Sequence, residues 1–168
     1  VGRYCTIESP KHEWVAVEAS VNSLHITDLG LLLTGHVDRV RDTEAGYGIT
    51  DLKSGKTAVR LDGRAKAHGH AAQLGIYELI AIAATALDIQ APAQVIGLQT
   101  NQTPELQRIG TAEIFGAREV LIGDDHHTGL LTTASKIVHG QIDAWGNPKS
   151  MMCHENYCPN YQSCFWRR

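Results

Sequence analysis

Three strand-like segments followed by one long apolar helix constrain the fold of this chain more than any other feature. Residues 13–24 (EWVAVEASVNSL), 31–40 (LLLTGHVDRV) and 47–53 (YGITDLK) are rich in β-branched or apolar residues. Short polar turns join them, which predicts an antiparallel meander. Residues 70–88 (HAAQLGIYELIAIAATALD) are alanine-rich and apolar on one side, so they predict a helix that packs on the sheet.

The second half of the chain adds further elements. Residues 93–100 (AQVIGLQT) predict a fourth strand, another strand is expected near residues 119–122, and residues 128–140 predict a final helix that ends at glycine. Strands on both sides of a helix in the sequence predict an α/β fold with a mixed central sheet flanked by helices. The 168 residues suit one domain, 1–168, whose residues 141–168 form a cysteine-rich tail.

Composition excludes several classes of protein. Hydrophobic residues make up 43% of the chain and charged residues 20%, unlike disordered, collagen-like or coiled-coil proteins. No apolar run approaches the ~20 residues of a membrane span, and the first residues do not resemble a signal peptide. We therefore expect a cytoplasmic protein without membrane contact. The net charge of −3 neither suggests DNA binding nor excludes a local basic groove.

Two aspartates and a lysine are the most informative polar residues. Side chains alternate along a strand, so Asp51 and Lys53 share one face. If the second and third strands pair, Asp38 lies beside Asp51, and adjacent carboxylates are tolerated when Mg²⁺ or Mn²⁺ lies between them. A lysine there can orient the attacking water or stabilise the transition state of phosphodiester hydrolysis. The alternative is an exposed ion pair without a function.

Three motifs in order carry a resemblance to a known family. GHVDRV, ITDLKSG and QLGIY resemble the G-x-x-D, (D/E)-x-K and Q-x-x-x-Y motifs of the RecB-like branch of the PD-(D/E)XK nuclease superfamily. The resemblance covers roughly residues 13–168 and implies a restriction-endonuclease-like core. It also implies that Asp38 and Asp51 bind Mg²⁺ or Mn²⁺ together with the backbone carbonyl of Leu52, and that Lys53 is the catalytic lysine.

The same resemblance assigns supporting roles. Gln73 and Tyr77 match the motif along the DNA-binding side, with core packing as the alternative for Tyr77, and Glu18 matches a supporting glutamate. In this branch a helical histidine usually precedes the first strand. Here His12 lies too close to the strand to belong to such a helix. His36 is either a substitute ligand or only a neighbour of Asp38. We expect that an N-terminal helical segment with this histidine is missing.

The cysteines are concentrated near the C-terminus. Cys153, Cys158 and Cys164 lie within twelve residues, which favours a metal over disulfides in a cytosolic protein. This triplet resembles that of iron–sulfur exonucleases of the AddB and CRISPR-associated type, although its first gap is longer. The resemblance implies a 4Fe–4S cluster with Cys5 as the fourth ligand, or else an ordinary thiol at Cys5. Zinc is the rival metal, with Cys5 or His154 completing a tetrahedral site.

Two further groups of polar residues have both a functional and a plain interpretation. Four basic residues after the D-x-K motif either contact a phosphate backbone that approaches Asp51 or form a solvated loop. A group of aspartates and histidines offers metal ligands or forms a polar loop that caps the last helix. The first group is Lys56, Arg60, Arg64 and Lys66, and the second is Asp124, Asp125, His126 and His127.

These features together predict a metal-dependent DNA exonuclease of recombination or repair, with a phage source left open. The expected partners are single-stranded or double-stranded DNA ends and helicase or recombination proteins. The alternative is a non-catalytic DNA-binding or assembly subunit of a recombination complex that retains the nuclease fold. A third possibility is a structural domain that binds zinc.

Overall fold

A computed structural model describes residues 2–100, 103–146 and 153–166 of the chain. Contacts divide the chain into two compact units, Val1–Thr132 and Thr133–Arg168. None of the helices within the described ranges is long and apolar enough to cross a membrane. The main elements are β1 (Glu13–Ile26), β2 (Leu31–Asp42), β3 (Gly48–Gly55), α1 (Ala71–Thr85), β4 (Ala93–Gln99), β5 (Ile109–Ile114), α2 (Ala117–Ile122) and α3 (Leu130–Val138).

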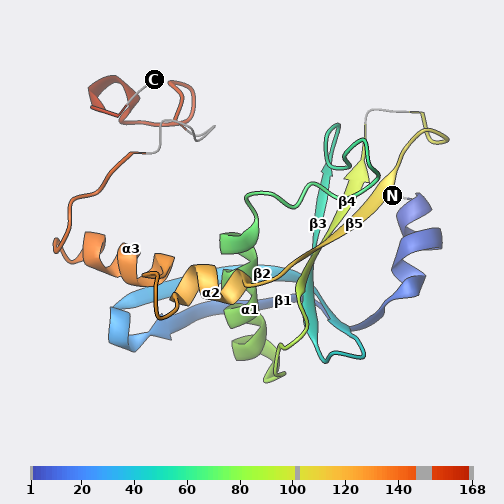
Figure 1. Cartoon of the computed structure of the whole chain (residues 1–168), viewed down its shortest axis with the longest axis horizontal. Coiled ribbons are helices and arrows are strands. Elements are labelled where there is room, and N and C mark those ends of the chain that lie inside the picture. The colour runs from blue at the N-terminus through green and yellow to red at the C-terminus, as the bar shows by residue number, and fades with distance from the viewer. Residues whose placement is uncertain (1, 101–102, 147–152, 167–168) are drawn as a thin grey trace. The chain divides into compact units, whose positions relative to one another are not determined.

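The first unit is built on a five-stranded sheet in the order β1-β2-β3-β4-β5 (Figure 1). All neighbouring strands run antiparallel except β3 and β4, which are parallel. A parallel pair needs a long crossover, and α1 lies in that connection. The predicted mixed sheet with flanking helices is therefore confirmed, and so is the meander of the first three strands.

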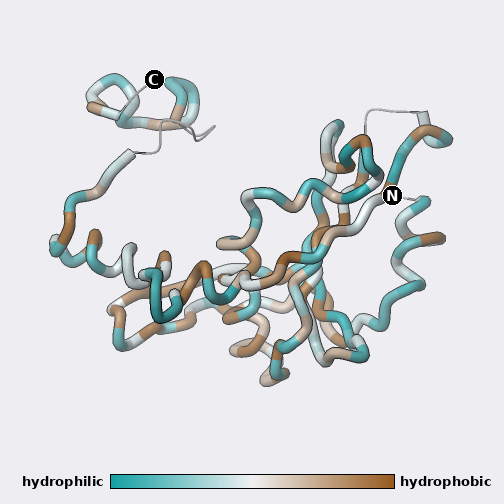
Figure 2. The backbone as a smooth tube through the Cα atoms, in the orientation of Figure 1, coloured by the Kyte–Doolittle hydropathy of each residue, from teal (hydrophilic) through white to brown (hydrophobic). Residues whose placement is uncertain are grey.

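Helix α1 packs on the sheet and supplies much of the core. It contacts β1, β2 and β3 on one side and α2 on the other. Leu74 and Ile80 of α1 are fully buried together with Ile49 of β3 and Val95 of β4. Hydrophobic residues recur along α1 and along the β1–β2 pair in Figure 2. Burying this apolar face holds the N-terminal end of α1 beside β3.

One strand prediction is wrong. Residues 119–122 belong to helix α2, and the last strand is β5, at Ile109–Ile114. Gly116, with φ of 70°, turns the chain between them, and Ala117 and Leu121 then bury one helical face. A β-carbon at Gly75 of α1 would collide with the carbonyl oxygen of Ala117, so close packing against α1 favours the helix over a strand.

Candidate active site

The pairing of β2 with β3 brings the two predicted metal ligands together. Arg39 of β2 pairs with Thr50 of β3, and one step along this register Asp38 stands opposite Asp51. The backbone N–H of Leu52 donates a hydrogen bond of 2.8 Å to Oδ2 of Asp38. The backbone of β3 therefore fixes the carboxylate of Asp38 beside the residue that carries the second carboxylate.

The carboxylate of Asp51 is buried, with 2% of the residue exposed. Burial raises the pKa of Asp51 above its ordinary value, Lys53 opposes this shift, and the charge of Asp38 adds to it. Nζ of Lys53 donates a hydrogen bond of 3.1 Å to Oδ1. Nζ of Lys53 also lies 2.9 Å from Oδ2, in an ion pair without hydrogen-bond geometry. Oδ2 therefore accepts no hydrogen bond from the described residues. Oδ2 forms an ion pair but keeps lone pairs that no described donor uses, and such a buried oxygen suits a cation.

Lys53 is held between strand β3 and helix α1. Its Nζ also donates a hydrogen bond of 3.0 Å to Oε1 of Gln73. The Nε2 of Gln73 in turn donates to the hydroxyl of Tyr77, 2.8 Å away, one helical turn further along α1. The sequence motif on α1 thus fixes the position of the ammonium group through a chain of hydrogen bonds.

His70 belongs to this cluster, although the sequence analysis did not select it. It precedes α1 as the N-cap residue, and its side chain makes no capping bond. Its side chain lies near that of Gln73, and burial lowers the pKa of His70, with a further lowering by the charge of Lys53. The signal that could have identified it is its spacing of three residues from Gln73, since such pairs share a helical face.

Among the described residues, Glu18, His36 and His12 form no hydrogen bond or ion pair with this cluster. The register of β1 and β2 puts Glu18 opposite Asp38, but Glu18 is exposed and has a φ of 52°. His36 is exposed on β2. Nε2 of His12 lies 3.2 Å from the buried carboxylate of Glu8. The described residues contain no group of three His, Cys, Asp or Glu side chains that could hold a metal ion.

The four cysteines are distributed over the two units. Cys5 is exposed in the first unit, whereas Cys153, Cys158 and Cys164 are half-buried in the second, and all four are free thiols. Residues 147–152 and 167–168 of the predicted tail lie outside the described residues.

The contacts of Asp124 support the interpretation of residues 124–127 as a polar loop. Oδ1 of Asp124 accepts hydrogen bonds from the backbone N–H groups of His126 and His127, at 2.8 and 2.7 Å. These bonds lower the pKa of Asp124 and close the loop on itself. The carboxylate thereby organises its own turn, six residues before α3 begins at Leu130.

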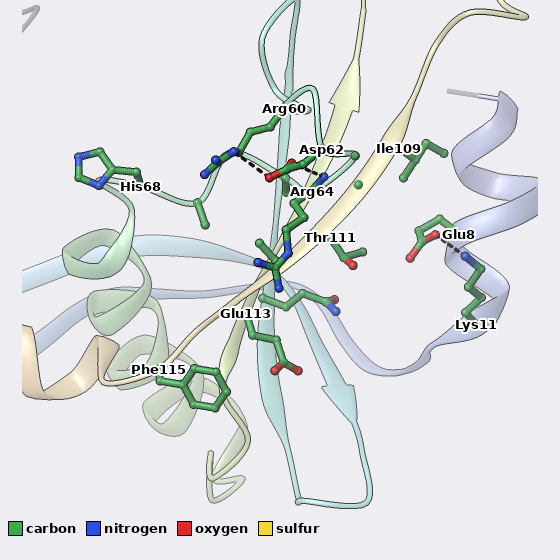
Figure 3. Close-up of a pocket in the computed structure, with 16 residues that line it drawn as sticks. Glu8, Lys11, Arg60, Asp62, Arg64, His68, Ile109, Thr111, Glu113 and Phe115 are labelled. Atoms are coloured by element: carbon green, nitrogen blue, oxygen red, sulfur yellow. Dashed lines mark hydrogen bonds and ion pairs between the residues drawn. The ribbon is translucent and has the colours of Figure 1, made fainter.

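A cavity of about 770 Å³ lies across the edge strand β5, and the acid pair is not among its lining residues (Figure 3). Figure 3 shows Arg60 and Arg64 beside Asp62 on one side, and the ion pair of Glu8 and Lys11 on another. Both signs of charge alternate around this cavity. Its walls therefore do not select an anion or a cation.

Comparisons with known proteins identify the family. No curated protein matches this chain significantly. The model of one family, described as the PD-(D/E)XK nuclease superfamily, matches residues 2–165. The match includes the acid pair, the lysine and the residues of α1 described above. Because it covers nearly the whole chain, the protein belongs to the PD-(D/E)XK nuclease superfamily.

Proposed function

We propose that this protein is a metal-dependent nuclease that hydrolyses phosphodiester bonds of DNA, with Asp38, Asp51 and Lys53 as its catalytic residues. The observation that carries the proposal is the buried carboxylate of Asp51. One of its oxygens has no hydrogen-bond donor among the described residues, and a second aspartate and a lysine lie next to it. Such an arrangement costs free energy in the folded protein and is expected at functional sites.

The donors around Asp51 suit a hard divalent cation. The carboxylates of Asp38 and Asp51 and the backbone carbonyl of Leu52 would hold Mg²⁺ or Mn²⁺ through oxygen, which both ions prefer. When bound, such an ion lowers the pKa of a coordinated water and neutralises charge on the phosphate. Among the described residues two carboxylates come together here, so water and substrate oxygens would complete the coordination, as is usual for Mg²⁺.

Lys53 acts on the phosphate in this proposal. Its ammonium is held by Asp51 and Gln73, at 3.1 and 3.0 Å, and its side chain keeps 27% exposure. It can therefore donate a hydrogen bond to the attacking water or to a phosphate oxygen as negative charge builds there. Because its position is set in advance by the strand and the helix, little reorganisation is needed during the reaction.

We further propose that the enzyme is an exonuclease of DNA recombination or repair that acts with helicase or recombination proteins. The test is digestion of end-labelled linear DNA, single-stranded and double-stranded, beside closed circular DNA, in Mg²⁺, Mn²⁺ or EDTA. An exonuclease degrades only the linear substrates, and only with metal. Cleavage of the circles would make the enzyme an endonuclease. Metal-independent DNA binding without cleavage would favour the non-catalytic assembly subunit.

We propose a 4Fe–4S cluster, with zinc as the rival, for the cysteines of the second unit. Its support is the chemistry of the donors: Cys153, Cys158 and Cys164 are free, half-buried thiols close together in sequence. The described side chains do not gather them into a three-ligand group. The test is iron, sulfide and zinc analysis of anaerobically purified protein. Brown protein with iron supports the cluster, colourless protein with zinc supports the rival, and metal-free protein overturns both.

A further inference from the structure

A loop of basic residues lies flat against the sheet beside Lys53. This basic loop, residues 56–66, follows β3 and folds back on itself, since the N–H of Arg60 donates to the carbonyl oxygen of Arg64 at 2.8 Å. Lys53 pairs with Gly97 of β4, which pairs with Gly110 of β5.

These two glycines make room for the loop. A β-carbon at Gly97 would collide with the carbonyl oxygen of Ala58, and one at Gly110 would collide with the carbonyl oxygen of Gly63. The loop therefore contacts the sheet closely, next to the lysine of the active site.

A cavity of about 590 Å³, here called the basic pocket, lies between this loop and the ends of β4 and β5. Four of its lining side chains are cationic and one is acidic, although the chain as a whole has a net charge of −3. The cationic residues are Lys56, Arg60, Lys66 and Arg108, and the acidic residue is Asp62. Such a concentration of one sign of charge on a cavity wall selects an anionic ligand.

The floor of the basic pocket is organised by a buried amide. Gln99 has 8% exposure, and its Oε1 accepts a hydrogen bond of 3.0 Å from Nε of Arg108. Its Nε2 donates a bond of 3.2 Å to the carbonyl oxygen of Lys56. Gln99 pairs with Gly55, two residues beyond Lys53, so the floor lies about 7 Å along β3 from the lysine.

Most of the positive charge in the basic pocket is free to meet a ligand. Oδ2 of Asp62 lies 3.4 Å from Nε of Arg60, so the carboxylate neutralises the charge of that guanidinium. Lys56, Lys66 and Arg108 have no acidic partner in the described part of the chain, and both lysines are exposed. Leu61, at 95% exposure, adds an apolar side chain at the rim. Exposed ammonium groups above an apolar surface suit a strand that presents both phosphates and bases.

We propose that the basic pocket binds backbone phosphates of the DNA strand, next to the phosphate that is cleaved at Asp51 and Lys53. This inference rests on the proposed function for the identity of that strand. Lys56, Lys66 and Arg108 contact the phosphates, and Gln99 positions Arg108. These phosphate contacts are independent of base sequence.

The test is the binding of the full chain to closed circular single-stranded DNA in EDTA at several salt concentrations. A circle has no terminal phosphate, so only internal phosphates are measured, and EDTA prevents cleavage. The variant is Lys56→Ala with Lys66→Ala. The matched control, Lys11→Ala with Lys136→Ala, removes the same charge outside the pocket. The lysine-to-arginine variant of the same two positions keeps the charge.

The expected result is a weaker dependence of binding on salt in the alanine variant. Loss of two phosphate contacts lowers the slope of log K against log salt by about 1.4 and weakens binding at 0.1 M salt by on the order of tenfold. The arginine variant keeps wild-type binding. An alanine variant with the slope of the control overturns the proposal. Because the binding test does not depend on cleavage, this result would not contradict the proposed nuclease function. Conversely, a failed nuclease assay would not contradict the binding of phosphates in the basic pocket.

Discussion

The backbone N–H of Leu52 donates a hydrogen bond of 2.8 Å to Oδ2 of Asp38. Leu52 lies between Asp51 and Lys53, so one short stretch of β3 presents a carboxylate and an ammonium and also positions the carboxylate of the neighbouring strand. The relative placement of the three side chains is therefore set by strand pairing rather than by a mobile loop. Preorganisation of this kind is what a site for charge stabilisation requires.

Asp51→Asn is expected to stabilise the metal-free protein while it removes cleavage. Burial raises the pKa of Asp51 above its ordinary value of 3.8, so the folded state binds this proton more tightly than the unfolded state. The stability that this proton contributes is fully present below the pKa of Asp51 in the unfolded state. It is lost as the pH rises through the pKa of Asp51 in the folded state. Above the pKa of the folded state the ionised Asp51 therefore costs stability, and the asparagine variant avoids this cost.

Calorimetry in EDTA between about pH 4 and pH 8 checks this expectation. The midpoint of Asp51→Asn should exceed that of the wild type at neutral pH by about 2–4 °C, the shift for ~1 kcal/mol in a chain of this size. The difference should shrink toward acidic pH, and added Mg²⁺ should raise the midpoint of the wild type only. A variant less stable than the wild type at neutral pH would contradict this account of Asp51.

Gln73→Ala is expected to slow cleavage while DNA binding is retained. The amide oxygen of Gln73 accepts a hydrogen bond of 3.0 Å from Nζ of Lys53, so its loss lets the ammonium adopt other positions. We expect a decrease in kcat of about 10- to 100-fold with little change in KM. Tyr77→Phe removes only the bond between Tyr77 and Gln73 and should have a smaller effect. Equal losses in the two variants would show that Gln73 does not act through Lys53.

His70→Ala is expected to reduce kcat, because the side chain of His70 lies near Gln73 and near the charges of Lys53 and Asp51, which shift its pKa. Burial lowers the pKa of His70 below 6.5, so the imidazole is neutral at pH 7 and becomes a cation beside Lys53 only in acid. His70→Gln keeps a hydrogen-bonding group without this charge and should restore much of the rate. Its kcat should also fall less steeply than that of the wild type below pH 6.5. Identical pH profiles would remove His70 from the site.

Gly97→Ala is expected to destabilise the protein and displace the basic loop. The new β-carbon would collide with the carbonyl oxygen of Ala58, and overpacking of this kind costs about 1–3 kcal/mol. Gly2→Ala is the control, since nothing lies within 4 Å of its β-carbon. Urea unfolding and DNA affinity measure the two effects. If Gly97→Ala is as stable as Gly2→Ala, the loop does not lie as closely on the sheet as described.

The parts of the site that follow a local period could be predicted from the sequence. Alternation along a strand predicted that Asp51 and Lys53 share one face of the sheet. A spacing of four residues predicted that Gln73 and Tyr77 share one face of the helix. His70 was missed because none of the three motifs includes it, so its spacing of three residues from Gln73 was its only signal.

Other features depend on contacts between segments far apart in sequence. The segment at residues 119–122 contains β-branched residues, yet it is helical because its Ala117–Leu121 face packs on α1. The close approach of the basic loop to Gly97 also joins separate segments, so no local pattern indicates it. The positions of the free cysteines likewise do not follow from their spacing alone.

The role of Lys53 is tested by single-turnover cleavage of linear DNA in Mg²⁺ by the wild type and by Lys53→Ala. Lys136→Ala, which removes a lysine from α3, serves as the control for the loss of one positive charge. We expect Lys53→Ala to lower the rate by about 10²- to 10³-fold, the cost of removing one group that stabilises developing charge, while the control cleaves like the wild type. Cleavage by Lys53→Ala at the wild-type rate would contradict the assignment of this site.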